Sequence, residues 1–135
     1  MLELVVATTL IAGTLVPALR LMRDSMSVSS GLEVRELLTT FCVSKLEEHL
    51  AIVAATWQAG TATGTFTAEG YPQLRFEVTR SDAVASGGIV NTLMAISCTV
   101  WHDQNGDGLR GSSEPKVNLS SKLAKMAVYQ YEAVS

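Results

Sequence analysis

The chain shows three patterns of hydrophobic and polar positions in succession. The first is the segment from Leu4 to Leu19, sixteen residues without a charge. As a helix it extends about 24 Å, somewhat less than the roughly 30 Å hydrocarbon core of a bilayer. Arg20 and Arg23 follow directly, with side chains long enough to reach the membrane surface. The pattern predicts a short membrane helix, and Pro17 predicts a kink near its end.

A secretory signal peptide also begins with an apolar run, but a basic residue precedes that run and a small-x-small cleavage site follows it. This chain has Glu3 at its start instead, and more helix-type sequence follows the apolar run. An ionised Glu at membrane depth costs at least roughly 2 to 3 kcal/mol. Glu3 is therefore expected to have a partner, and the alternative is that it lies solvated at the membrane surface.

The second pattern is an amphipathic helix between residues 34 and 53. Apolar residues recur there every three or four positions, with mostly polar residues on the other side. This apolar stripe consists of Val34, Leu38, Phe41, Cys42, Leu46, Leu50 and Val53. Between the two patterns lies SMSVSSG, residues 25–31, which is poor in helix formers, and Ser30 with Glu33 makes a capping box. We expect residues 1–30 to be a membrane and assembly helix with a weak or broken junction, and residues 31–135 to be the head.

The third pattern, after Ala55, is that of strands and turns. Residues 56–64 and 81–88 are expected to be loops, and strands are expected at 64–69, 72–80, 91–101 and 116–131, although the last segment leaves a helix possible. The residues expected on the buried faces of two of these strands are Leu74, Phe76 and Val78, and Met94, Ile96, Cys98 and Val100. The predicted fold class is α+β: a long N-terminal helix, hydrophobic in its first half and amphipathic in its second, packed on a small antiparallel sheet.

Charge and cysteine content exclude several kinds of function. Ten Lys and Arg stand against thirteen Asp and Glu, and the basic residues are scattered, so no nucleic-acid footprint is present. Cys42 and Cys98 have no CxxC or Cys/His spacing, which argues against a zinc site or a thioredoxin-like pair. They are either one disulfide or two buried thiols, and they could meet where the helix packs on the sheet.

The second stretch with recognisable chemistry is residues 103–114. It satisfies the calcium-loop pattern D-x-[DN]-x-[DN]-G-x5-E at every position. The expected ligands are Asp103, Asn105, Asp107, the Leu109 carbonyl and Glu114. The flanking elements are strands rather than helices, and Arg110 stands where such loops usually have an aliphatic residue. The alternative is a polar hairpin whose Asn-Gly and Asp-Gly steps simply make turns.

No catalytic constellation is predicted. His49 and His102 have no Ser, Cys or carboxylate arrangement around them in the sequence and are expected to be surface or partly buried histidines. The aromatic residues Trp57, Trp101, Tyr71 and Tyr129 are expected to be core and rim residues. We therefore do not expect an enzyme.

The N-terminal segment MLELVVATTLIAGTLVPAL resembles that of type IV pilins and of type II secretion pseudopilins, with Glu3 matching the family's Glu and Leu2 the apolar residue before it. The body is similar to minor pseudopilins of the I type and to V-type minor pilins. That similarity covers VSKLEEHLA, a strand ending in Trp and Asp, and VNLSSKLAK. The leader ending in Gly and the Phe that begins the mature protein are absent, so the chain is expected to start two residues inside the mature form.

The resemblance implies a structural subunit, a minor pseudopilin or minor pilin. It would be anchored in the bacterial inner membrane by one span, with its head in the periplasm, before it assembles into a filament. Glu3 would be an assembly residue that pairs with the free N-terminal amine of a neighbouring subunit. The implied partners are other pilin or pseudopilin subunits, the inner membrane and, if a leader exists, a prepilin peptidase. The alternative function is a secreted or anchored calcium-binding β module acting as an adhesin or binding domain.

Overall fold

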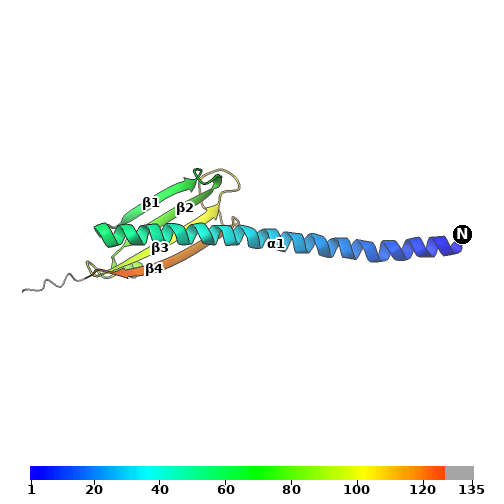
Figure 1. Cartoon of the computed structure of the whole chain (residues 1–135), viewed down its shortest axis with the longest axis horizontal. Helices are drawn as coiled ribbons and strands as arrows, with labels where there is room; N and C mark the ends of the chain where they lie inside the picture. Colours follow the sequence, from blue (N-terminus) through cyan, green and yellow to red (C-terminus); the bar gives the residue numbers. More distant parts are fainter. Residues whose placement is uncertain (127–135) are drawn as a thin grey trace, which may run out of the picture. The chain divides into compact units, whose positions relative to one another are not determined.

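The protein contains one long helix followed by a four-stranded sheet, as a computed structural model describes it for residues 1–126 (Figure 1). The elements are helix α1 (Leu2–Thr56), strands β1 (Gly60–Phe66) and β2 (Tyr71–Ser81), the short 3-10 helix η1 (Val84–Ser86), and strands β3 (Leu93–His102) and β4 (Lys116–Ala124). The second half of α1 packs on the antiparallel sheet. This confirms the predicted α+β class.

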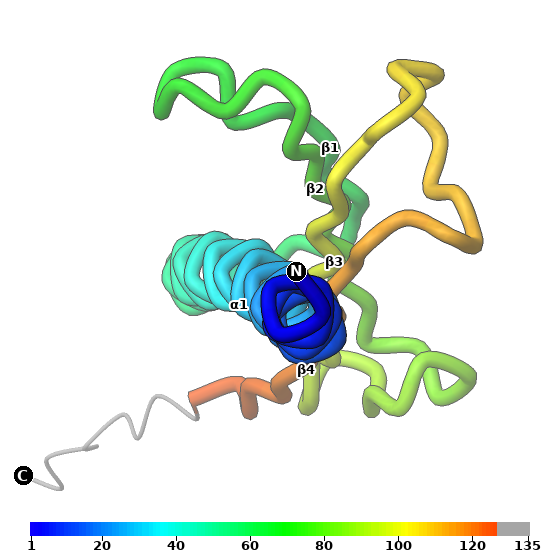
Figure 2. Tube along the Cα trace, turned by 90° about the vertical axis from the view of Figure 1, so that its right-hand side faces the viewer, coloured from blue at the N-terminus to red at the C-terminus, as the bar shows by residue number. Residues whose placement is uncertain are grey.

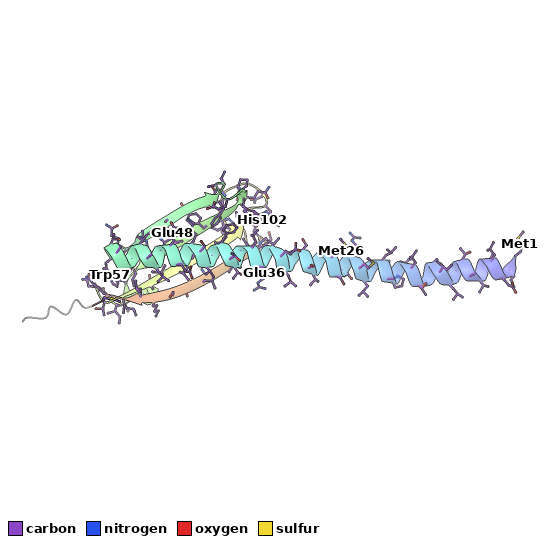
Figure 3. The ribbon with its side chains drawn as sticks, viewed as in Figure 1. Met1, Met26, Glu36, Glu48, Trp57 and His102 are labelled. Atoms are coloured by element: carbon purple, nitrogen blue, oxygen red, sulfur yellow. The ribbon has the colours of Figure 1, made fainter. Side chains whose placement is uncertain are left out.

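Helix α1 runs through two compact units, Met1–Glu36 and Leu37–Ser135. Residues 25–31 were expected to be a weak or broken junction, and the broken alternative is wrong because this stretch is helical throughout. Its serines and Gly31 each cost a few tenths to about 1 kcal/mol of helix propensity. Starting a helix is costly, whereas extending one adds a hydrogen bond per residue, so a helix continues through a short poor stretch. The side chains of residues 1–33 are all exposed, including that of Met26, which Figure 3 labels.

The sheet is a meander in the order β1-β2-β3-β4, with β1 and β4 at its edges. Strand β1 begins at Gly60, inside the segment 56–64 that the sequence predicted to be a loop, so that prediction is wrong over its second half. Gly64 shows why a glycine-rich segment can be a strand here. A Cβ at this position would lie 2.9 Å from the ring of Phe76, so only glycine leaves room for that ring.

The core lies between the second half of α1 and one face of the sheet. The helix contributes Leu38, Cys42 and Val53 from the predicted stripe, and the other stripe residues are partly buried. Strand β3 contributes its predicted face, and Leu74 and Val78 of β2 are also buried. The β3 residues are Met94, Ile96, Cys98 and Val100. The predicted buried face of β3 is therefore confirmed, and that of β2 is confirmed for Leu74 and Val78, whereas Phe76 is half-buried.

Strand β4 settles the ambiguous C-terminal segment as a strand, ending at Ala124. The part of the predicted strand from 127 to 131 lies outside the described residues, as does Tyr129. Trp101 is buried, Trp57 is half-buried and Tyr71 is mostly exposed, as expected for core and rim aromatics.

Candidate functional site

The chain between β3 and β4 forms the loop that the sequence singled out, and Figure 2 shows it extending away from the second half of α1. Gly106 and Gly108 have φ angles of 72° and 75°, in the left-handed region that favours glycine. These two turns fold the loop around the carboxylate of Asp103. Its Oδ1 accepts the Gly106 N–H at 3.0 Å and its Oδ2 accepts the Gly108 N–H at 2.9 Å.

Glu114 closes the loop from its other end. Its Oε1 accepts the N–H of Gln104 at 3.0 Å, and its Oε2 accepts the N–H of Gly111 at 2.8 Å. The Glu114 side chain therefore lies beside the start of the loop, although it is ten residues further along the chain than Gln104. Asp103 and Glu114 are both buried, which is unusual for carboxylates unless they are paired or hydrogen-bonded.

Asp107 is exposed and completes the acidic cluster. Its Oδ1 accepts the Leu109 N–H at 2.8 Å, and its Oδ2 accepts the side-chain amide of Asn105 at 3.1 Å. One oxygen each of Asp103, Asp107 and Glu114 lies within 4.8 Å of the other two. The fold thus brings together the three predicted carboxylates and places Asn105 against one of them.

The spacing of these oxygens fits a calcium ion. Calcium holds oxygen ligands at about 2.3 to 2.6 Å, so two ligands of one ion lie at most about 5 Å apart. Oδ1 of Asp103 and both oxygens of Glu114 each accept one backbone N–H and keep a second lone pair, whereas Oδ2 of Asp103 accepts from both Gly108 and Arg75. The predicted ligands are carboxylate, amide and carbonyl oxygens, which are of the hard-oxygen type that calcium prefers.

Arg75 is a member of this site that the sequence reasoning missed. Its Nε donates to Oδ2 of Asp103 at 2.7 Å, forming an ion pair between β2 and the loop. Burial alone would raise the pKa of Asp103, but the hydrogen bonds from Arg75 and Gly108 outweigh it and hold that pKa below its ordinary value. The sequence indicated only that Arg75 lies on the outward face of a strand. It did not indicate the pairing with Asp103, because the two residues are 28 positions apart.

The apolar half of α1 contains a second candidate. Between residues 2 and 19 the polar side chains are Glu3, Thr8, Thr9 and Thr14. Each threonine hydroxyl donates to a carbonyl one turn earlier, at 2.7 Å from Thr8, 2.8 Å from Thr9 and 3.1 Å from Thr14. Glu3 is different, because within residues 1–126 its carboxylate has no hydrogen bond or ion pair.

Comparison of the chain with known proteins found no relative. No protein-family model, no curated protein and no solved structure matches the chain. Helix α1 is long and apolar enough in its first half to cross a membrane, by length and composition.

The two histidines lie in different places, His49 on α1 and His102 directly before Asp103 of the loop. His49 is buried on α1, and its Nδ1 has no hydrogen-bond partner among the described residues. His102 is at the end of β3, where its Nε2 and Oε1 of Gln73 are 3.0 Å apart. The burial of His49 is greater than the sequence predicted, because it lies on the helix face that packs on the sheet.

Proposed function

We propose that this chain is a structural subunit, a minor pseudopilin or minor pilin of a type II secretion or type IV pilus-like filament, inserted in the bacterial inner membrane before assembly. The observation that carries the proposal is Glu3, the one polar side chain of residues 2–19 that the helix itself does not satisfy. A lone carboxylate in an apolar segment is costly unless a charge from outside the chain offsets it. The amine of a neighbouring subunit has the required charge.

The continuity of α1 also supports this function. A single helix carries the apolar segment and, at its other end, the buried stripe of the head. The threonine hydroxyls of the apolar half donate hydrogen bonds to carbonyls of their own helix. This suits a hydrocarbon environment, because an unpaired polar group there costs several kcal/mol. The head would then lie in the periplasm, and other filament subunits would be its partners.

The test is Glu3→Gln, made in the native bacterium. The variant should stay in the membrane fraction, because insertion depends on the apolar run, but it should lose its cross-links to other subunits, because assembly depends on the charge pair. Mild cross-linking followed by purification and mass spectrometry is the measurement. Glu33→Gln, on an exposed position of the same helix, is the matched control and should cross-link normally. Equal cross-linking of the Glu3 variant and the wild type would contradict the assembly role.

Calcium binding by the loop is proposed as part of the same subunit. Asp103, Asp107 and Glu114 would hold the ion with Asn105 and the Leu109 carbonyl, and the ion would neutralise the carboxylates and tie the two ends of the loop together. Because an ion that binds only the folded state stabilises it, calcium at one hundred times its Kd would add about 2.7 kcal/mol. Magnesium should stabilise less, since its small octahedral shell suits a flexible loop poorly.

The measurement is a thermal melt of the full chain in detergent with calcium, with magnesium and with a chelator. Glu114→Gln should lose most of the calcium-induced rise in Tm while it keeps an oxygen to accept a backbone N–H. Glu47→Gln, an exposed acid on α1 outside the loop, should keep the whole rise. A wild-type Tm that calcium leaves unchanged would favour the polar hairpin instead.

The second candidate function, a calcium-binding β module acting as an adhesin or binding domain, is favoured by the same converging carboxylates. The two functions differ in their dependence on Glu3. A binding module would retain its ligand and its location when Glu3 is replaced, whereas a filament subunit would lose its partners.

A further inference from the structure

The two cysteines meet in the middle of the head. Cys42 lies on α1 and Cys98 on β3, 56 positions apart in the chain, and both are completely buried. The Sγ of Cys42 donates to the backbone carbonyl of Cys98 at 3.3 Å and lies 3.9 Å from the carbonyl oxygen of Val117 on β4. The Cys42 thiol is therefore placed directly over the residue that carries the other thiol.

This contact is the place where a covalent bond would have the greatest effect on the head. Helix α1 is joined to the sheet by a single covalent connection, residues 57–59, which lead into the edge strand β1. Cys98 is on β3, two strands away from that connection in the sheet order. A bond between Cys42 and Cys98 would fix the helix to the centre of the sheet, and the chain closed by it would include β1, β2 and most of β3.

We propose that Cys42 and Cys98 form an intramolecular disulfide that fastens α1 to β3 when the chain folds in the presence of a disulfide oxidant. One cysteine thiolate attacks the oxidant's disulfide, which forms a mixed disulfide and releases one oxidant thiol. The other cysteine thiolate then attacks the mixed disulfide and releases the second oxidant thiol. The two cysteines lose two electrons and two protons, and the oxidant's two sulfurs gain them.

The burial of the pair determines when this exchange takes place. Neither sulfur is open to solvent in the folded head, so an oxidant cannot reach it. The bond therefore forms while the chain folds, before the helix covers the sheet, and the folded head then protects it from reductants.

The experiment is refolding of the full chain in detergent, with and without glutathione disulfide, followed by alkylation, proteolysis and mass spectrometry. After oxidative refolding we expect no alkylated cysteine and one peptide pair that links Cys42 to Cys98. The already folded, reduced protein should resist the same oxidant for much longer than the refolding chain. Alkylation of both cysteines after oxidative refolding, or disulfides only between different chains, would overturn the proposal.

The melting temperature shows whether the disulfide stabilises the head. The closed loop is long, so the oxidised chain should melt about 8 °C or more above the reduced chain. The variant with Cys42→Ala and Cys98→Ala is the control and should have the same Tm with and without oxidant. A linked chain that melts no higher than its reduced form would also overturn the proposal, and this comparison of two wild-type samples does not depend on any variant folding.

Discussion

The two halves of α1 share one backbone geometry but differ in their surroundings. Residues 1–33 have every side chain exposed, whereas Leu38, Cys42, His49 and Val53 are buried in the second half. Buried apolar surface stabilises the second half by about 25 cal/mol per Å². The first half receives no such contribution from the other described residues, 1–126. By length and composition it could cross a membrane, where an apolar medium would surround its side chains.

The same contrast applies to polar groups. The apolar half satisfies its threonines within the helix, whereas Glu3 has no partner among residues 1–126. The packed half contains His49 in the core and meets the sheet that carries the acidic loop. One continuous helix therefore has two halves whose side chains have different surroundings.

The largest effect is expected from removing a buried side chain of the second half. Leu38→Ala should lower the stability of the head by about 2 to 5 kcal/mol, because it removes methyl groups and leaves a cavity. Leu15→Ala makes the same change at an exposed position of the first half. It should alter the free energy of unfolding of the head by less than about 0.5 kcal/mol. Thermal melts of both variants in detergent give the comparison. Equal losses would show that the two halves do not differ as described.

A charge in the first half should act on location instead of stability. Leu10→Arg replaces an exposed apolar side chain by one that costs about 2.5 to 3.5 kcal/mol at the centre of a membrane helix. The chain should move out of the membrane fraction, and the Tm of the head should stay unchanged. Ser29→Arg, beyond the apolar run, is the control and should remain in the membrane. Retention of the Leu10 variant would indicate that the apolar segment does not anchor the protein.

The smallest effect is expected from pH, and it should belong to the packed half alone. Burial and the nearby positive charge of Arg80 lower the pKa of His49, while Glu48 opposes them and Lys45 adds to them. Between this lowered pKa and the ordinary value of 6.5 the unfolded chain binds more protons than the folded chain. Stability should therefore decrease as the pH falls below about 6.5 and level off below the folded pKa.

Urea unfolding of the full chain in detergent between pH 5 and pH 7.5 measures this dependence. His49→Gln should flatten it in that range, because glutamine does not titrate. The other histidine provides the control, since His102→Gln should leave the dependence in place. A wild-type curve that is flat over this range would be inconsistent with a buried, unprotonated His49.

Much of the fold was predictable because it depends on local spacing. The helical stripe that ends at Val53 and the alternation around Val78 and Cys98 repeat at the periods of a helix and a strand, so they identify buried faces without any tertiary information. The acidic loop was equally local, since its three carboxylates lie within twelve consecutive residues and two glycines mark its turns.

Predictions failed where a distant residue decides the local structure. Residues 60–63 were expected to be a loop but form the start of β1 because they pair with β2, and nothing near them in the chain indicates that partner strand. The stretch 25–31 is helical because helix extension is cooperative, whereas the prediction weighed its residues one by one. The preferences of single residues predict a helix or strand poorly when pairing with a distant strand, or the helix on either side, contributes more to its stability.

The sequence by itself determined the order of helix and strands, the apolar segment with Glu3, and the calcium-type spacing of residues 103–114. The tertiary structure alone decided that Arg75 pairs with Asp103, that His49 is buried and that Cys42 meets Cys98. The physical reason is the range of the interactions. Helix and strand periods act between residues a few positions apart, whereas these three environments depend on how the helix, the sheet and the loop pack together.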